Sequence, residues 1–196
     1  MIELYCGDFR EIVPKLQKSF DLIVADPPYA KKYNYLYSAL GDITETNLKD
    51  HGFLLTILPH FNIHKVIQLI ERPGIRFWWL LYMYHKPPSV RSQLIQFGVK
   101  VDGKPIGWFI KGTRPKKLGY RNDVCLCDKE KGLFKWQQPL DWGLYCVEHF
   151  SELGDCVLDP MMGVGTIGEA CKLLERDFIG IELDPEIYTI AKERLK

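Results

Sequence analysis

Short apolar runs bounded by turn residues alternate along the chain with segments whose apolar residues recur at helical spacing. The pattern predicts strands at 2–6, 20–25, 53–58, 75–84, 156–160 and 178–182. It predicts helix ends near 18, at 47–50 and near 175, helices at about 63–71 and 142–152, and a last helix from 185. Alternation of this kind is typical of a mostly parallel sheet covered by helices. The run at 75–84 is apolar apart from Arg76, which fits a strand covered on both faces.

The pattern changes between residues 85 and 121, where prolines and glycines interrupt the chain repeatedly. Within this segment residues 108–112 are the clearest strand, and the alternating run around Cys125 and Cys127 also predicts a strand. We therefore expect one domain over residues 1–196, with a small insert at about 85–125.

Composition limits what the protein can do. The chain has 196 residues and a formal net charge of +1, so any contact with nucleic acid has to come from a local basic patch. Its first residues lack the basic and apolar regions of a signal peptide, and the apolar run at 77–84 is too short to cross a bilayer. The six cysteines form no C-x-x-C pair. We expect a cytoplasmic protein with buried thiols, no metal and no membrane partner.

A glycine turn follows the expected strand that ends in Asp159 and Pro160. Gly163, Gly165 and Gly168 satisfy G-x-G-x-x-G, and Glu182 ends the next strand about twenty residues on. Glycines allow a ligand to approach the backbone, and a carboxylate in that place can accept both ribose hydroxyls. The motif alone leaves a dinucleotide site, an S-adenosylmethionine site and a turn that binds nothing as alternatives.

The position of this turn favours S-adenosylmethionine. A nicotinamide-binding fold begins with such a unit, whereas this chain ends fourteen residues after Glu182. The other strands must therefore come from upstream, so the sheet is circularly permuted relative to a dinucleotide domain. Asp159 directly before the turn also places a carboxylate where it would attract a sulfonium cation and repel a pyrophosphate.

The expected strand at 20–25 runs directly into Asp26-Pro27-Pro28-Tyr29. Two consecutive prolines stiffen this loop and remove two backbone donors. An exocyclic base amine is a poor nucleophile, and the Asp26 carboxylate and the Pro27 carbonyl can accept its two N–H groups as charge develops on nitrogen. Tyr29 offers a ring on which the base can stack, a contact worth roughly 1–3 kcal/mol. A proline-stiffened turn with no ligand is the alternative interpretation.

Together these motifs resemble the amino-methyltransferases that modify adenine N6 or cytosine N4 in DNA, in the permuted, β-type order. The resemblance covers LYCGDFREIVPKL with FDLIVADPPYA at one end and VLDPMMGVGTIGEACKLLERDFIGIELDPEIYTIAKERL at the other. It implies a three-layer, Rossmann-like α/β fold with a mixed, mostly parallel sheet, in which S-adenosylmethionine is converted to S-adenosylhomocysteine. The resemblance implies that the catalytic residues are Asp26, Pro27, Pro28 and Tyr29. The cofactor is implied to contact Asp8, Phe9, Asp26, Asp159, Pro160, Gly163, Gly165, Thr166, Glu182 and Leu183.

Two segments depart from the family pattern. The glycine turn usually contains a phenylalanine and a serine, where this chain has Met161 or Met162 and Val164. The segment before the cofactor strand normally carries a histidine, a proline and a lysine. Residues 136–141 read WQQPLD here, so Gln138 and Pro139 alone are transferred from the family.

Family members place their target-recognition element where this chain has its irregular segment. That segment is basic, and such residues suit contacts with phosphate. The candidate DNA contacts are Lys100, Lys104, Lys111, Arg114, Lys116, Lys117 and Arg121. Because the element is short, we expect a short target, a homodimer or a partner that supplies recognition.

The sequence thus predicts transfer of a methyl group to a base amine in DNA, as in a restriction-modification system. The D that opens the tetrapeptide resembles the adenine-directed members, so adenine N6 is the expected target. An RNA adenosine N6-methyltransferase is the nearest alternative. A subunit that binds nucleic acid or cofactor for an active partner is a second alternative, and an oxidoreductase based on the glycine motif is a third.

Overall fold

A computed structural model describes residues 1–86, 92–94, 97–113, 121–128 and 132–196. Its main sheet has eight strands in the order β1-β10-β9-β2-β3-β7-β4-β8. The strands are β1 (Ile2–Cys6), β2 (Phe20–Ala25), β3 (Leu48–Ile57), β4 (Ile75–His85), β7 (Gly103–Lys111), β8 (Val124–Cys127), β9 (Cys156–Asp159) and β10 (Asp177–Glu182). Pairing is parallel from β1 to β3 and between β4 and β8, whereas β7 runs antiparallel to both neighbours.

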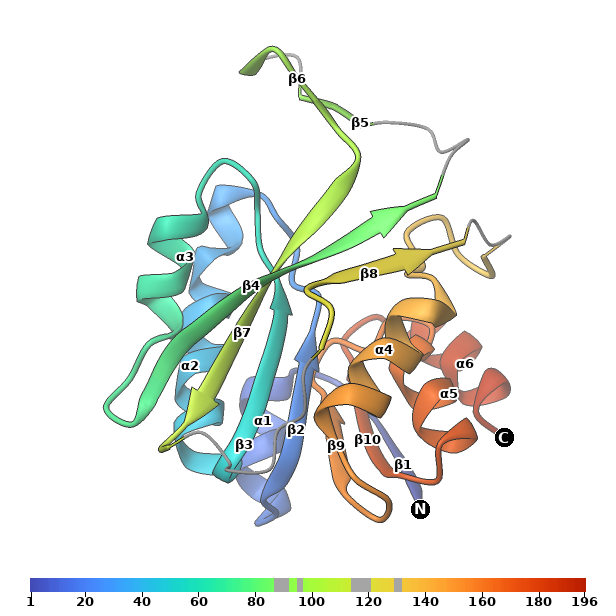
Figure 1. Cartoon of the computed structure of the whole chain (residues 1–196). Coiled ribbons are helices and arrows are strands. Elements are labelled where there is room, and N and C mark those ends of the chain that lie inside the picture. The colour runs from blue at the N-terminus through green and yellow to red at the C-terminus, as the bar shows by residue number, and fades with distance from the viewer. Residues whose placement is uncertain (87–91, 95–96, 114–120, 129–131) are drawn as a thin grey trace.

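Helices cover both faces of this sheet, which makes the fold a three-layer α/β sandwich (Figure 1). On one face lie α1 (Phe9–Leu16), α2 (Asn34–Asn47) and α3 (Ile63–Ile70), and on the other α4 (Leu140–Phe150), α5 (Thr166–Leu173) and α6 (Pro185–Arg194). A short 3-10 turn, Lys31–Tyr33, precedes α2. No helix in the described ranges is long and apolar enough to cross a membrane.

The central strand β2 shows why the two cores form. Leu22 and Val24 belong to the apolar cluster under α4, α5 and α6, and Ile23 and Ala25 belong to the cluster under α1, α2 and α3. Successive strand residues point to opposite faces, so an unbroken apolar run requires cover on both sides. Here both faces are covered, as the sequence predicts.

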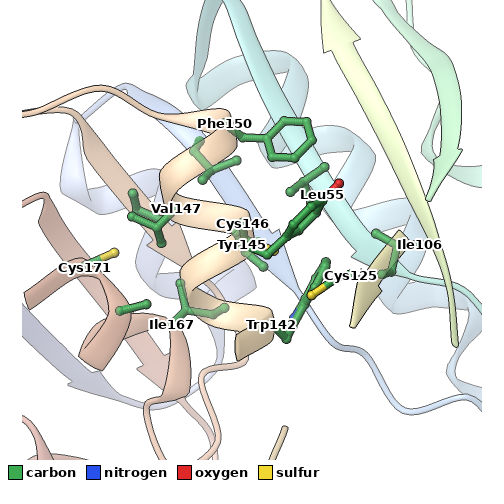
Figure 2. Close-up of a cluster of buried hydrophobic side chains, with 14 of the residues drawn as sticks. Leu55, Ile106, Cys125, Trp142, Tyr145, Cys146, Val147, Phe150, Ile167 and Cys171 are labelled. Carbon is green, nitrogen blue, oxygen red and sulfur yellow. The ribbon is translucent and has the colours of Figure 1, made fainter. Parts of the chain in front are cut away.

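Helix α4 supplies much of the first cluster. Figure 2 shows Trp142, Tyr145 and Phe150 pointing from this helix toward the sheet, where Leu55 and Ile106 lie. The Phe150 ring meets Trp108 edge-on at 5.0 Å between centroids, and aromatic pairs favour this geometry. The packing fixes the start of α4, and with it the Gln138-Pro139 segment, against the centre of the sheet.

Helix α2 is the longest helix in the described part of the chain, and the sequence pattern predicted only where it ends. Its buried residues Tyr37, Leu40 and Ile43 follow helical spacing, but Gly41 interrupts their pattern. A Cβ at Gly41 would lie 2.6 Å from the carbonyl oxygen of Ile70, so the glycine permits close packing on α3. Strand β3 then begins at Leu48, five residues before the predicted start.

Two expectations for the middle of the chain need correction. Strand β4 is not covered on both faces, because it lies near the sheet edge, and Trp79 and Tyr82 are 54% and 41% exposed. The segment at 85–125 is also more than an insert, since β7 lies inside it, β8 begins within it, and both are integral strands of the main sheet. Beyond them its described part is a hairpin of β5 (Ser92–Leu94) and β6 (Val99–Val101), which projects past the sheet in Figure 1.

Candidate active site

A cavity of about 470 Å³ opens at the carboxyl ends of β1, β10, β9 and β2. From β9 the chain proceeds through α5 to β10, whereas from β2 it proceeds through α2 to β3 on the other side. The cavity therefore lies at the topological switch point of the sheet, where α/β folds bind ligands. Its volume falls within the range of small-molecule sites.

Most of the residues expected at a cofactor site line this cavity. They are Asp8, Phe9, Asp26, Pro160, Asp159, Gly163, Thr166, Glu182 and Leu183, with Pro28 from the tetrapeptide. Gly165 is the expected cofactor residue that does not line it. A Cβ at Gly165 would lie 2.9 Å from Leu195 Cδ1, so this glycine makes room for the C-terminal residues.

Gly163 has a different place in the same turn. Its φ is +54°, and a Cβ on it would have no atom within 4 Å, so its backbone faces open space. Its N–H donates to Glu182 Oε2 at 2.9 Å, and the other oxygen of Glu182 accepts from the Asp184 N–H at 2.9 Å. The carboxylate of Glu182 is therefore fixed at the cavity wall by two backbone donors.

Directly after the neighbouring strand β1, the Gly7 N–H donates to the carbonyl of Glu182 at 2.8 Å. Asp8 then caps α1, and its side chain accepts from the Arg10 N–H at 2.9 Å. The Arg10 guanidinium pairs with the same carboxylate and holds the pKa of Asp8 below its usual value. Arg10 also lies 5.1 Å from the Tyr35 ring centroid. The positive charge of Arg10 thus already balances the negative charge of Asp8 at this wall.

Several lining residues were not predicted from the sequence. They are Arg10, Tyr33, Tyr35, Leu36, Phe134, Trp136, Gln137 and Trp142, whereas Gln138, which also lines the cavity, was transferred from the family pattern. Trp136 is 71% exposed although it lines the cavity, which marks it as a residue of the mouth. For Trp136 and Gln137 the available signal was the W-Q-Q-P run that replaces the family pattern.

The cavity wall is acidic. Asp8, Asp26, Asp159 and Glu182 line it, and Arg10 is the basic residue in the described wall. Asp159 is 5% exposed, and burial raises the pKa of its carboxyl well above the usual value, with further contributions from the charges of Asp26 and Glu182. A cationic ligand would relieve this unfavourable burial of negative charge.

The Asp26 carboxylate sits in a network of donors. Tyr29 donates its hydroxyl to Oδ1 at 2.7 Å, and Gln138 Nε2 donates to Oδ2. Lys104 Nζ donates to Gln138 Oε1 at 2.9 Å and lies 5.7 Å from the Tyr29 ring centroid. Burial raises the pKa of Asp26, and the Lys104 charge and the two hydrogen bonds oppose that rise.

The expected basic patch is dispersed. Lys100 is exposed on β6. Lys104 faces Asp26 and Gln138, while Lys111 donates to the carbonyls of Glu45 and Leu48 at the far end of β7. Arg121 donates to the carbonyl of His149 and lies over the Phe150 ring, so three of these cations have intramolecular partners. Arg114, Lys116 and Lys117 lie outside the described residues.

Comparisons with known proteins fit this geometry. A family model for N6/N4 methyltransferases, described as DNA methylase, matches residues 20–193. The Type II methyltransferase M.HpaI of Haemophilus parainfluenzae is 35% identical over 230 residues, which cover 98% of this chain and 73% of the relative. That of Xanthomonas campestris pv. cyanopsidis, M.XycI, is 47% identical over 51 residues, which cover 26% of this chain and 17% of the relative.

A solved structure adds the cofactor. The crystal structure of an M1.HpyAVI–SAM complex superposes with a TM-score of 0.81 and 27% sequence identity, covering all of both chains. This chain belongs to the N6/N4 DNA amino-methyltransferase family. Its fold is that of the S-adenosylmethionine-dependent enzymes, and S-adenosylmethionine is its cofactor.

The residues present fit that group. The acidic wall suits a sulfonium and an ammonium, Gly163 leaves open space where the backbone meets the cavity, and Glu182 presents a fixed carboxylate at the end of β10. The departures in the glycine turn do not block the cavity. Met161, Met162 and Val164 all line it, and the Met162 sulfur also lies against Gly180 on β10, where an added Cβ would be 2.3 Å away.

Proposed function

We propose that this enzyme methylates the N6 amine of adenine in DNA, with Asp26, Pro27, Pro28 and Tyr29 as its catalytic residues. The supporting observation is the position of this loop, which follows β2 at the switch point and presents Asp26 to the cavity that contains Asp159 and Glu182. The aspartate that opens the tetrapeptide supports adenine over cytosine.

The chemistry follows from the acceptors on this loop. When bound, S-adenosylmethionine would supply an electrophilic methyl group on a cationic sulfur, so that the amine nitrogen would form its bond to the methyl carbon as the carbon–sulfur bond breaks and the neutral thioether leaves. Asp26 accepts one N–H of the base amine, and the carbonyl of Pro27 accepts the other, so the nitrogen lone pair is directed at the methyl carbon. The extra proton leaves through Asp26 to water. Tyr29 donates to Asp26 and provides a stacking surface.

For the cofactor we propose two groups of contacts. Glu182 would bind the ribose, with Asp8 and Phe9 near the adenine. Asp159, Pro160, Gly163 and Thr166 would surround the methionine part, with Leu183 at the margin. Each of these residues lines the cavity. Gly165 is left out, because it packs on Leu195.

For DNA we propose fewer contacts than the sequence suggests. Lys100 remains a candidate for phosphate contact because it is exposed on the projecting hairpin. We do not propose Lys111 and Arg121 as DNA contacts, since their charged groups already donate to backbone carbonyls. A duplex target would require the base to be flipped out of the stack to reach Asp26.

Nucleoside mass spectrometry tests the proposal. Purified protein and S-adenosylmethionine are incubated together with duplex DNA, single-stranded DNA or RNA, each in a separate sample. We expect N6-methyldeoxyadenosine in a DNA sample. N4-methyldeoxycytidine instead would overturn the adenine assignment, and methylated adenosine in RNA alone would overturn the DNA assignment.

The residue roles are tested with Asp26→Ala. Because the base amine loses its acceptor, we expect methyl transfer to fall by at least roughly a hundredfold. Because Asp159 and Glu182 remain, calorimetry should show that cofactor binding is retained. Asp50→Ala is the matched control, since Asp50 is exposed on β3, away from the cavity. Equal loss of transfer and cofactor binding in Asp26→Ala would contradict the catalytic role. Cofactor binding without any transfer by the unmodified protein would indicate a subunit that needs an active partner.

A further inference from the structure

Lys104 is a cation that the fold turns inward to the reaction site. It lies on β7, where Lys104, Ile106 and Trp108 share one face because strand residues alternate. Ile106 and Trp108 belong to the core cluster covered by α4. Lys104 is therefore directed toward the segment that leads into α4, and toward the end of β2 beyond it.

The contacts of Lys104 determine the orientation of Gln138. The ammonium donates to Gln138 Oε1 at 2.9 Å, so the amide must present its NH₂ group on the opposite side. That group donates to Asp26 Oδ2. With no donor at position 104 the amide would be free to rotate and to turn its oxygen toward the carboxylate, an arrangement that repels.

Charge acts in the same direction as orientation. Asp26 has to be ionised to take up the proton that the amine releases, and the ionised form is also the stronger acceptor for the base N–H, but burial opposes ionisation by raising the pKa of Asp26. The groups that face Asp26 are Tyr29 in its own loop, Tyr37 on α2, Gln138 before α4 and Asp159 on β9, together with Lys104. Asp159 repels the carboxylate, whereas Lys104 is the cation that attracts it.

The environment of Lys104 itself favours this role. Burial lowers the pKa of Lys104, and the charge of Asp26 and the thiol of Cys127 on β8 raise it again. The ammonium also lies over the Tyr29 ring, which stabilises a cation. Lys104 and Asp26 therefore stabilise each other's charged forms across Gln138.

We propose that Lys104 is a positioning residue for methyl transfer, which orients Gln138 toward Asp26 and keeps that carboxylate ionised. The inference rests on the proposed catalytic role of Asp26. It replaces the sequence-based expectation that Lys104 contacts DNA phosphate.

The test is the pH dependence of the single-turnover rate of methyl transfer, which excludes product release. In Lys104→Met the carboxylate loses its cation, so the pKa of Asp26 rises and the acidic limb of the profile moves to higher pH. We expect the acidic limb to shift by about one pH unit. At pH values below the limb the rate should then be roughly tenfold lower than that of the unmodified protein, and the difference should disappear as pH is raised. Lys104→Arg keeps the charge and should restore the limb.

Controls separate this role from folding and from DNA contact. Lys65→Met, on the exposed side of α3, should leave the profile unchanged. If Lys104→Met does not fold, Lys104→Gln provides a second neutral variant that still has a donor for Gln138. An unshifted limb in a folded neutral variant would overturn the proposal, as would a rate loss equal at every pH or a weakened salt dependence of DNA binding. Absence of transfer in the unmodified protein would instead count against the proposed function.

Discussion

Two glycines in one turn should respond differently to the same substitution. Gly163 has a φ of +54° with open space where a Cβ would lie, and Gly165 has a φ of +81° with Leu195 Cδ1 at 2.9 Å. Both need a left-handed backbone, which costs a residue with a Cβ about 1–2 kcal/mol. The added methyl group then projects into the cavity at Gly163 and into the packed C-terminal helix at Gly165.

The expected free energies follow from these positions. Gly163→Ala should lower the free energy of unfolding by about 1–2 kcal/mol. It should also weaken cofactor binding roughly tenfold, because the methyl group occupies space that the ligand needs. Gly165→Ala combines the same backbone strain with crowding against Leu195, so it should cost about 2–3 kcal/mol of stability. Its cofactor affinity should stay near that of the unmodified protein.

Urea denaturation measures the free energies of unfolding, and isothermal calorimetry measures cofactor affinity. A double variant isolates the crowding, since Leu195→Ala should reduce the cost of Gly165→Ala by about 1 kcal/mol. Unchanged cofactor affinity in Gly163→Ala would refute the assignment of this glycine to the binding surface. Lost affinity in Gly165→Ala at full stability would refute its assignment to packing.

Two further predictions concern buried charge. Burial raises the pKa of Asp159 above its unfolded value, so the unfolded chain releases this proton more readily than the fold, and the cofactor-free protein loses stability as pH rises above the unfolded pKa. Asp159→Asn should therefore raise the melting temperature of the cofactor-free protein while it weakens cofactor binding, and a lowered melting temperature would contradict the electrostatic argument. Lys111→Met should leave the carbonyls of Glu45 and Leu48 without their donor and lower the free energy of unfolding by about 1–3 kcal/mol, with unchanged DNA affinity in salt-titrated binding assays. Weaker DNA binding at unchanged stability would instead support Lys111 as a DNA contact.

Sequence by itself determined the features that depend on neighbours along the chain. The β2 run that leads into Asp26, the strand that ends at Asp159 with the glycine turn after it, and the helix that begins at Pro185 are local patterns of alternation, chain reversal and capping. Local propensity and hydrophobic period specify such elements without reference to distant residues. The fold class and the family follow from their order.

Only the tertiary structure decided which distant side chains meet. Gln138 and Asp26 are 112 positions apart, and nothing near either one announces their contact. Lys104 and Lys111 lie on the same strand, yet one reaches the reaction site and the other reaches carbonyls at the far end of α2. The glycines at 163 and 165 look alike in the motif, but one faces the cavity and the other faces Leu195. The order of the strands and the face of the sheet on which each residue lies determine these contacts, because they determine which groups a side chain of given length can reach.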